Sequence, residues 1–117
     1  MSEKTIPLTT FIRHADTAEL EDWGALKEAT GAEMATSGLT LWTDGDQEIG
    51  IWQCTPGPSR WLLETHEFVH IVGGRMTVTI DGGEPVELSK GDTAVFPKGW
   101  SGTWDIAETV RKVYVIF

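Results

Sequence analysis

Apolar and polar residues alternate with a period of two through much of the chain after Leu39. Residues 76–80 show this clearly, because methionine, valine and isoleucine occupy one face and two threonines occupy the other. The Asp81-Gly-Gly sequence that follows can close a hairpin onto residues 85–88, since glycine readily adopts positive φ angles. This pattern predicts a half-buried β-hairpin.

The last eight residues, 110–117, alternate in the same way, but both of their faces are largely apolar. Such a strand is expected at the centre of a sheet. Short runs rich in Val, Ile, Thr and Trp are separated by turn signals at Asp44-Gly-Asp, Pro56-Gly-Pro, Asp81-Gly-Gly, Lys90-Gly-Asp, Lys98-Gly and Ala107-Glu-Thr. Strands and turns at this spacing predict an all-β sandwich or barrel.

Residues 1–36 differ from the rest because they contain helix formers and few β-branched residues. Asp16 or Thr17 could cap a helix, so we expect a short helix or turns in this segment. The sequence is therefore divided into an N-terminal segment, residues 1–36, and a β-domain, residues 37–117. The N-terminal segment is expected to pack on the barrel or on a partner subunit, because it carries Phe11, Ile12, Leu20, Trp23 and Leu26.

Composition narrows the possible partners. The chain has 117 residues, a size that suits one domain, and 18 acidic residues against 9 basic ones give a formal charge of -9. This charge repels phosphate backbones and anionic membrane surfaces, so neither nucleic acid nor membrane is expected as a partner.

The chain has one cysteine, Cys54, which allows no internal disulfide. With no signal-like or membrane-spanning run at the start, we expect a cytoplasmic protein.

Two segments carry the spacing of paired cupin motifs. In the first, six residues separate Glu67 from Gly74, and in the second, Gly91 is followed by Pro97-Lys-Gly. Residues 49–57, 91–104 and 110–116 resemble the small cupins grouped with the cupin domain of (S)-ureidoglycine aminohydrolase. This resemblance implies a single jelly-roll cupin barrel and a homodimer. The enzyme that names the family is a two-cupin, manganese-dependent hydrolase.

The same resemblance argues against the usual cupin metal. Its four ligand positions fall near Trp61, Leu63, Glu67 and Gly102, and only Glu67 can bind a metal through its side chain. No cofactor is therefore predicted.

An alternative metal site could use His66, Glu67 and His70, completed by His14 or Cys54. In one continuous strand, however, the two histidines share a face and Glu67 takes the other. Only a turn at Thr65-His66 would let the three converge.

Glu67 itself needs a partner, since a buried carboxylate without one is costly. Lys112, Arg60 and Arg111 are candidate cations, and Lys112 shares a strand face with Tyr114. Glu67 and Lys112 are accordingly the candidate acid–base pair, and a purely structural ion pair or a neutral hydrogen-bonded acid is the alternative.

Six tryptophans offer a second kind of chemistry. Indoles around one polar group are typical of a small-molecule site, where they stack on planar ligands or hold cations. The predicted ligand-binding residues are Trp52, Trp61, Leu63, Trp100, Trp104 and Tyr114. Ordinary core packing, with the barrel filled by indoles, is the alternative.

Three functions remain open on this basis. The first is a cupin that binds a small molecule without metal, and the second is a metal-dependent small-molecule hydrolase or aminohydrolase. A dimeric scaffold without catalysis is the third. Glycine pairs at residues 91 and 99 match no phosphate-binding motif, and no serine nucleophile motif occurs.

Overall fold

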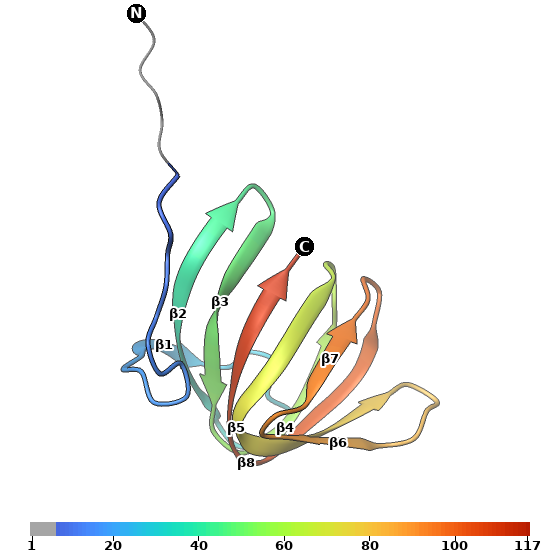
Figure 1. Cartoon of the computed structure of the whole chain (residues 1–117). Helices are drawn as coiled ribbons and strands as arrows, with labels where there is room; N and C mark the ends of the chain where they lie inside the picture. Colours follow the sequence, from blue (N-terminus) through green and yellow to red (C-terminus); the bar gives the residue numbers. More distant parts are fainter. Residues whose placement is uncertain (1–6) are drawn as a thin grey trace, which may run out of the picture.

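The computed structural model describes residues 7–117, which form an antiparallel β-barrel of the jelly-roll type (Figure 1). This confirms the predicted all-β cupin fold. The strands are β1 (Glu21–Ala25), β2 (Ala35–Asp44), β3 (Gln47–Cys54), β4 (Gly57–Leu62), β5 (Glu67–Ile80), β6 (Val86–Ser89), β7 (Thr93–Phe96) and β8 (Ser101–Ile116).

Two long strands, β5 and β8, connect two groups of shorter strands. The C-terminal half of β8 pairs with β3, and the facing half of β5 pairs with β7, so β1, β2, β3, β8, β5 and β7 form one layer. The N-terminal half of β8 pairs with β4, and the end of β5 pairs with β6, which gives the second layer. The core lies between these layers, and β8 is central, as its two apolar faces predicted.

Both long strands change layer at the same place. Gly74 has a φ of 78°, and a Cβ atom there would lie 2.0 Å from the carbonyl oxygen of Thr109. Only glycine fits such a close crossing with positive φ. The predicted turn at residues 107–109 is wrong for this reason: the segment continues β8, and irregular pairing with β5 allows the bend instead.

Of the short helix or turns expected near the N-terminus, the helix is wrong, since residues 7–117 contain no helix. Residues 15–17 form a turn in which the amides of Thr17 and Ala18 donate to the carbonyl of His14. Residues 21–25 are instead the edge strand β1, which pairs with β2. Tertiary pairing here overrides a weak helix propensity, and Gly24, with a φ of 82°, would interrupt a helix in any case.

Residues 7–20 lie along the outside of β2 in Figure 1. Arg111 of β8 donates to the carbonyls of Ala15 and Ala18 at 3.0 and 2.9 Å, and so holds this segment against the barrel. The expectation that the chain starts without a signal-like or membrane-spanning run concerns mainly residues 1–6, which lie outside the described residues. Within residues 7–117, no helix has the length and apolar character needed to cross a membrane.

The hairpin predicted from residues 76–88 is confirmed. β5 and β6 pair from Arg75 with Ser89 to Val78 with Val86, and the amide of Gly83 closes the turn onto the carbonyl of Ile80. Met76 and Val78 are buried, whereas Ile80 at the strand end is half-exposed. The alternation therefore located the buried face correctly and failed only at its last residue.

Candidate functional site

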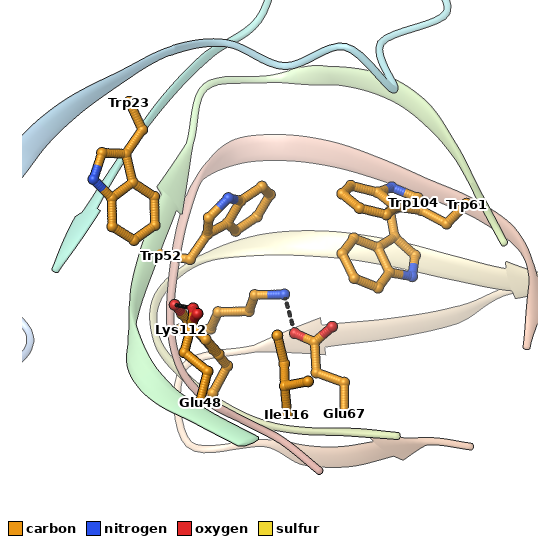
Figure 2. A pocket seen from close by; sticks show the side chains of 9 residues that line it. Trp23, Glu48, Trp52, Trp61, Glu67, Trp104, Lys112 and Ile116 are labelled. Atoms are coloured by element: carbon orange, nitrogen blue, oxygen red, sulfur yellow. Dashed lines mark hydrogen bonds and ion pairs between the residues drawn. The ribbon is translucent and has the colours of Figure 1, made fainter. Parts of the chain in front are cut away.

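A cavity of about 240 Å³ opens into the barrel between the two layers (Figure 2). Four tryptophans and three charged residues supply most of its wall. The lining residues are Trp23 of β1, Glu48 and Trp52 of β3, Trp61 of β4, Glu67 of β5, and Trp104, Lys112, Tyr114 and Ile116 of β8. The tryptophans line the barrel and leave space inside it, so the expected alternative of a filled barrel does not apply.

A buried ion pair forms the floor of the cavity. The Nζ atom of Lys112 lies 2.6 Å from the Oε2 atom of Glu67, and both side chains are at most one-tenth exposed. The sheet register places Ile116 of β8 opposite Glu67, and residues 112, 114 and 116 of β8 share one face, so the long side chain of Lys112 reaches the carboxylate along this face. Lys112 is thus the partner that Glu67 requires.

Two indoles complete the surroundings of the ammonium group. Nζ of Lys112 lies 4.6 Å from the ring centroid of Trp52 and 4.4 Å from that of Trp104. Cation–π contacts of this kind are worth about 2 kcal/mol when water is excluded. Lys112 is therefore held by one carboxylate and two aromatic faces, which fixes its position more closely than the ion pair alone.

A second group of contacts orients the two indoles of Trp61 and Trp104 in the cavity wall. Trp61 and Trp104 are stacked with ring centroids 4.4 Å apart, and Nε1 of Trp61 donates to Oγ of the buried Ser59 at 2.8 Å. That hydroxyl in turn donates to the carbonyl of Trp104 at 3.0 Å. Nε1 of Trp104 is buried and donates to no residue of the described chain. An unpaired buried donor is uncommon, and it is available to an acceptor.

Tyr114 and Glu48, which also line the cavity, are joined by a hydrogen bond. The tyrosine hydroxyl donates to a carboxylate oxygen of Glu48. Burial, together with the charge of Glu48, raises the pKa of Tyr114 above its ordinary value. The phenol therefore stays protonated and remains a hydrogen-bond donor at neutral pH.

The structure gathers most of the residues predicted from the sequence. Glu67, Lys112, Trp52, Trp61, Trp104 and Tyr114 all line the one cavity. Leu63 and Trp100 do not line it. The backbone of Leu63 bonds to Gly99 and Trp100, and the ring of Trp100 packs edge-on against Phe96 at 5.1 Å. These two residues pack against the core and do not line the cavity.

Three lining residues escaped the sequence analysis: Trp23, Glu48 and Ile116. Glu48 shares its strand face with Gly50 and Trp52, so the alternation along β3 could have revealed it. Trp23 gave no comparable signal, because its segment was expected to be helical. Its place depends on a long-range contact over Gly38 of β2, where a Cβ atom would lie 2.4 Å from the indole ring.

Many cupins hold a metal, and the residues present here do not fit one. At the positions of three usual ligands stand Trp61, Leu63 and Gly102. A Cβ atom at Gly102 would lie 2.2 Å from the carbonyl oxygen of Thr79, so this backbone has no room for histidine there. The fourth position, Glu67, is already paired with Lys112. The Lys112 ammonium group supplies the counter-charge to this carboxylate.

The alternative site at His66, Glu67 and His70 does not assemble either. Within residues 7–117, no three His, Cys, Asp or Glu side chains are grouped as metal ligands. Nδ1 of His66 accepts a hydrogen bond from the amide of Lys98, and its ring packs on Phe117. His70 lies with Asp16 and Lys90 in a separate hollow, while Glu67 points into the barrel.

The jelly-roll topology and the barrel cavity define a protein of the cupin class. The chain belongs to the EutQ-like cupin domain family, whose model matches residues 42–114. No curated protein matches the chain.

Solved structures share the fold of this chain. A protein of unknown function of the DUF861 family from Pseudomonas syringae pv. tomato aligns over 87% of this chain and 46% of its own, with a TM-score of 0.79 and 21% identity. The EutQ protein of Clostridium difficile aligns over 72% and 63%, with a TM-score of 0.64 and 22% identity. A DUF861 protein from Thermotoga maritima is 36% identical over 57% of this chain and 76% of its own, with a TM-score of 0.56. This chain thus spans less than two thirds of the first two neighbours.

Proposed function

We propose that this cupin binds a small organic molecule in the barrel cavity without a metal ion. The observation that carries the proposal is the Glu67–Lys112 pair, held between Trp52 and Trp104 at the floor of an open space of about 240 Å³. An apolar aromatic wall with a few fixed polar groups is the usual composition of a small-molecule site. Glu67 and Lys112 also remain the candidate acid–base pair, because both line the cavity within hydrogen-bond distance of each other.

Thermal-shift screening of a small-molecule library tests this proposal. A ligand at a hundred times its dissociation constant stabilises the folded state by about 2.7 kcal/mol, which is easily measured. We expect hits to raise the melting temperature of the wild type and of Val95→Ala, whose side chain is exposed on β7 away from the cavity. The same hits should fail on Trp52→Leu. Absence of any hit, or equal shifts in Trp52→Leu, would overturn the proposal.

A closer relation to the cupin domain of (S)-ureidoglycine aminohydrolase is a further proposal, supported by the motifs in residues 49–57, 91–104 and 110–116. Metal-dependent hydrolysis gains no support from the site, since three of the four usual ligand positions carry no ligand. Transfer of that activity is therefore not proposed.

Self-association is proposed as well, because apolar side chains are exposed near the N-terminal segment. Leu8 is 87% exposed and Phe11 68% exposed, and a shallow hollow is lined by Leu8, Thr10, Leu41, Trp42 and Ile49. A second copy of the chain that covers this region would form the homodimer expected from the sequence. Light scattering that shows a monomer at micromolar concentration would remove this proposal.

A further inference from the structure

The charges inside the cavity do not cancel. Of the three charged residues that line it, Glu67 and Lys112 neutralise each other through their 2.6 Å contact. Lys112 also faces two indole rings, so its ammonium group is fully engaged. Glu48 remains, and no Lys, Arg or His among residues 7–117 lies within ion-pair distance of it. The cavity therefore carries one net negative charge.

Hydrogen bonding holds Glu48 in place without balancing that charge. The Tyr114 hydroxyl donates a hydrogen bond to one carboxylate oxygen of Glu48. The other carboxylate oxygen accepts no hydrogen bond from the described residues. Glu48 is half-buried, so water screens its charge only in part. One carboxylate oxygen is thus available to a ligand.

Aromatic side chains line the same cavity as this carboxylate. Figure 2 shows Trp23, Glu48 and Trp52 on one side of the cavity and the Trp61–Trp104 stack on the other side. Glycines make this arrangement possible. A Cβ atom at Gly38 would lie 2.4 Å from the Trp23 ring, and one at Gly50 would lie 2.6 Å from the Tyr114 hydroxyl.

We propose that the ligand is a small organic cation, a quaternary ammonium or a protonated amine, whose positive group lies between the Glu48 carboxylate and the indole of Trp23. This inference rests on the proposed binding function. Aromatic faces and a carboxylate together attract a cation, since both present negative charge to it. An anion would face Glu48 and would have to displace Glu67 or two indoles to reach Lys112. A neutral ligand would leave Glu48 desolvated without a counter-charge.

Three probes of similar shape and different charge test the inference by isothermal titration calorimetry: choline, its neutral carbon analogue 3,3-dimethylbutan-1-ol, and the anion 3,3-dimethylbutanoate. We expect choline to bind at least about tenfold more tightly than the neutral analogue, with no binding of the anion. Glu48→Gln keeps an acceptor for Tyr114 and removes the charge, so it should abolish the preference for choline. Glu84→Gln, in the exposed β5–β6 turn, is the matched control and should bind as the wild type does.

The outcomes separate this inference from the proposal beneath it. Equal binding of choline and its neutral analogue, or unchanged choline affinity in Glu48→Gln, would overturn the cation inference. The cation inference would also fail if none of the three probes bound while library screening found neutral or anionic ligands. The proposed binding function would stand in that case. If neither probes nor library bound, both would fall.

Discussion

Lys112 and Glu67 lie 45 residues apart in the sequence, and their charged atoms are 2.6 Å apart in the barrel. Their strands, β8 and β5, are neighbours in the sheet, and both side chains point into the cavity. A pair buried to this degree has lost most of its hydration, so each charge depends on the other.

Removing one member of this pair should be costly. We expect Lys112→Met to lower the free energy of unfolding by about 3 kcal/mol, because it leaves the Glu67 carboxylate buried without a counter-charge. The double variant Glu67→Gln/Lys112→Met should recover most of that loss. Urea denaturation measures both, and Lys90→Met on the exposed β6–β7 turn is the control. Equal destabilisation by the single and double variants would show that the charges are not coupled.

Metal removal should have no effect on stability. The donor set around Glu67 does not suit a metal, so chelation with EDTA is expected to leave the melting temperature unchanged. Elemental analysis of protein purified without an affinity tag should give far less than one equivalent of manganese, iron, nickel or zinc. Near one equivalent in the wild type, lost in Glu67→Gln, would contradict this expectation and restore the metal-dependent hydrolase hypothesis.

Gly102 should resist substitution even by alanine. The new Cβ atom would lie 2.2 Å from the backbone oxygen of Thr79, and the backbone must move to relieve this contact. We expect Gly102→Ala to lower the unfolding free energy by about 1–3 kcal/mol. Gly73→Ala is the matched control, since its Cβ atom would meet only Arg111, at 3.9 Å. Similar thermal unfolding of the two variants would show that the Gly102 contact is unimportant.

The buried thiol of Cys54 should make stability fall at high pH. Burial raises the pKa of Cys54 from 9.0 to about 11, although the positive charge of Lys112 acts in the opposite direction. Between these pH values the unfolded chain has lost the thiol proton and the folded chain has kept it, so folding becomes less favourable as pH rises. Urea denaturation from pH 8 to 11 should show a shallower fall for Cys54→Ala than for the wild type. Parallel curves would mean that the thiol does not contribute.

The fold was predictable from local patterns because strand alternation and glycine turns are short-range properties. The spacing from Glu67 to Gly74 and from Gly91 to Pro97 indicated the cupin barrel, and the hairpin at residues 76–88 followed from its own sequence. Residues 107–109 were misassigned because the crossing at Gly74, which lets β8 continue through them, involves a distant strand. The edge strand β1 was missed for a similar reason, since its pairing with β2 overrides local propensity.

The sequence by itself determined which residues could bind a ligand or transfer a proton. It also determined that three of the four usual cupin metal ligands are missing. The motif spacing and the residue types were enough to place Glu67 in the barrel and to suggest Lys112 as its partner. Only the tertiary structure decided that the tryptophans leave a cavity, that Trp23 reaches it over Gly38, and that Leu63 and Trp100 lie outside it. Whether indoles fill or line a space depends on how strands far apart in the sequence pack, and residue spacing along one chain does not contain that information.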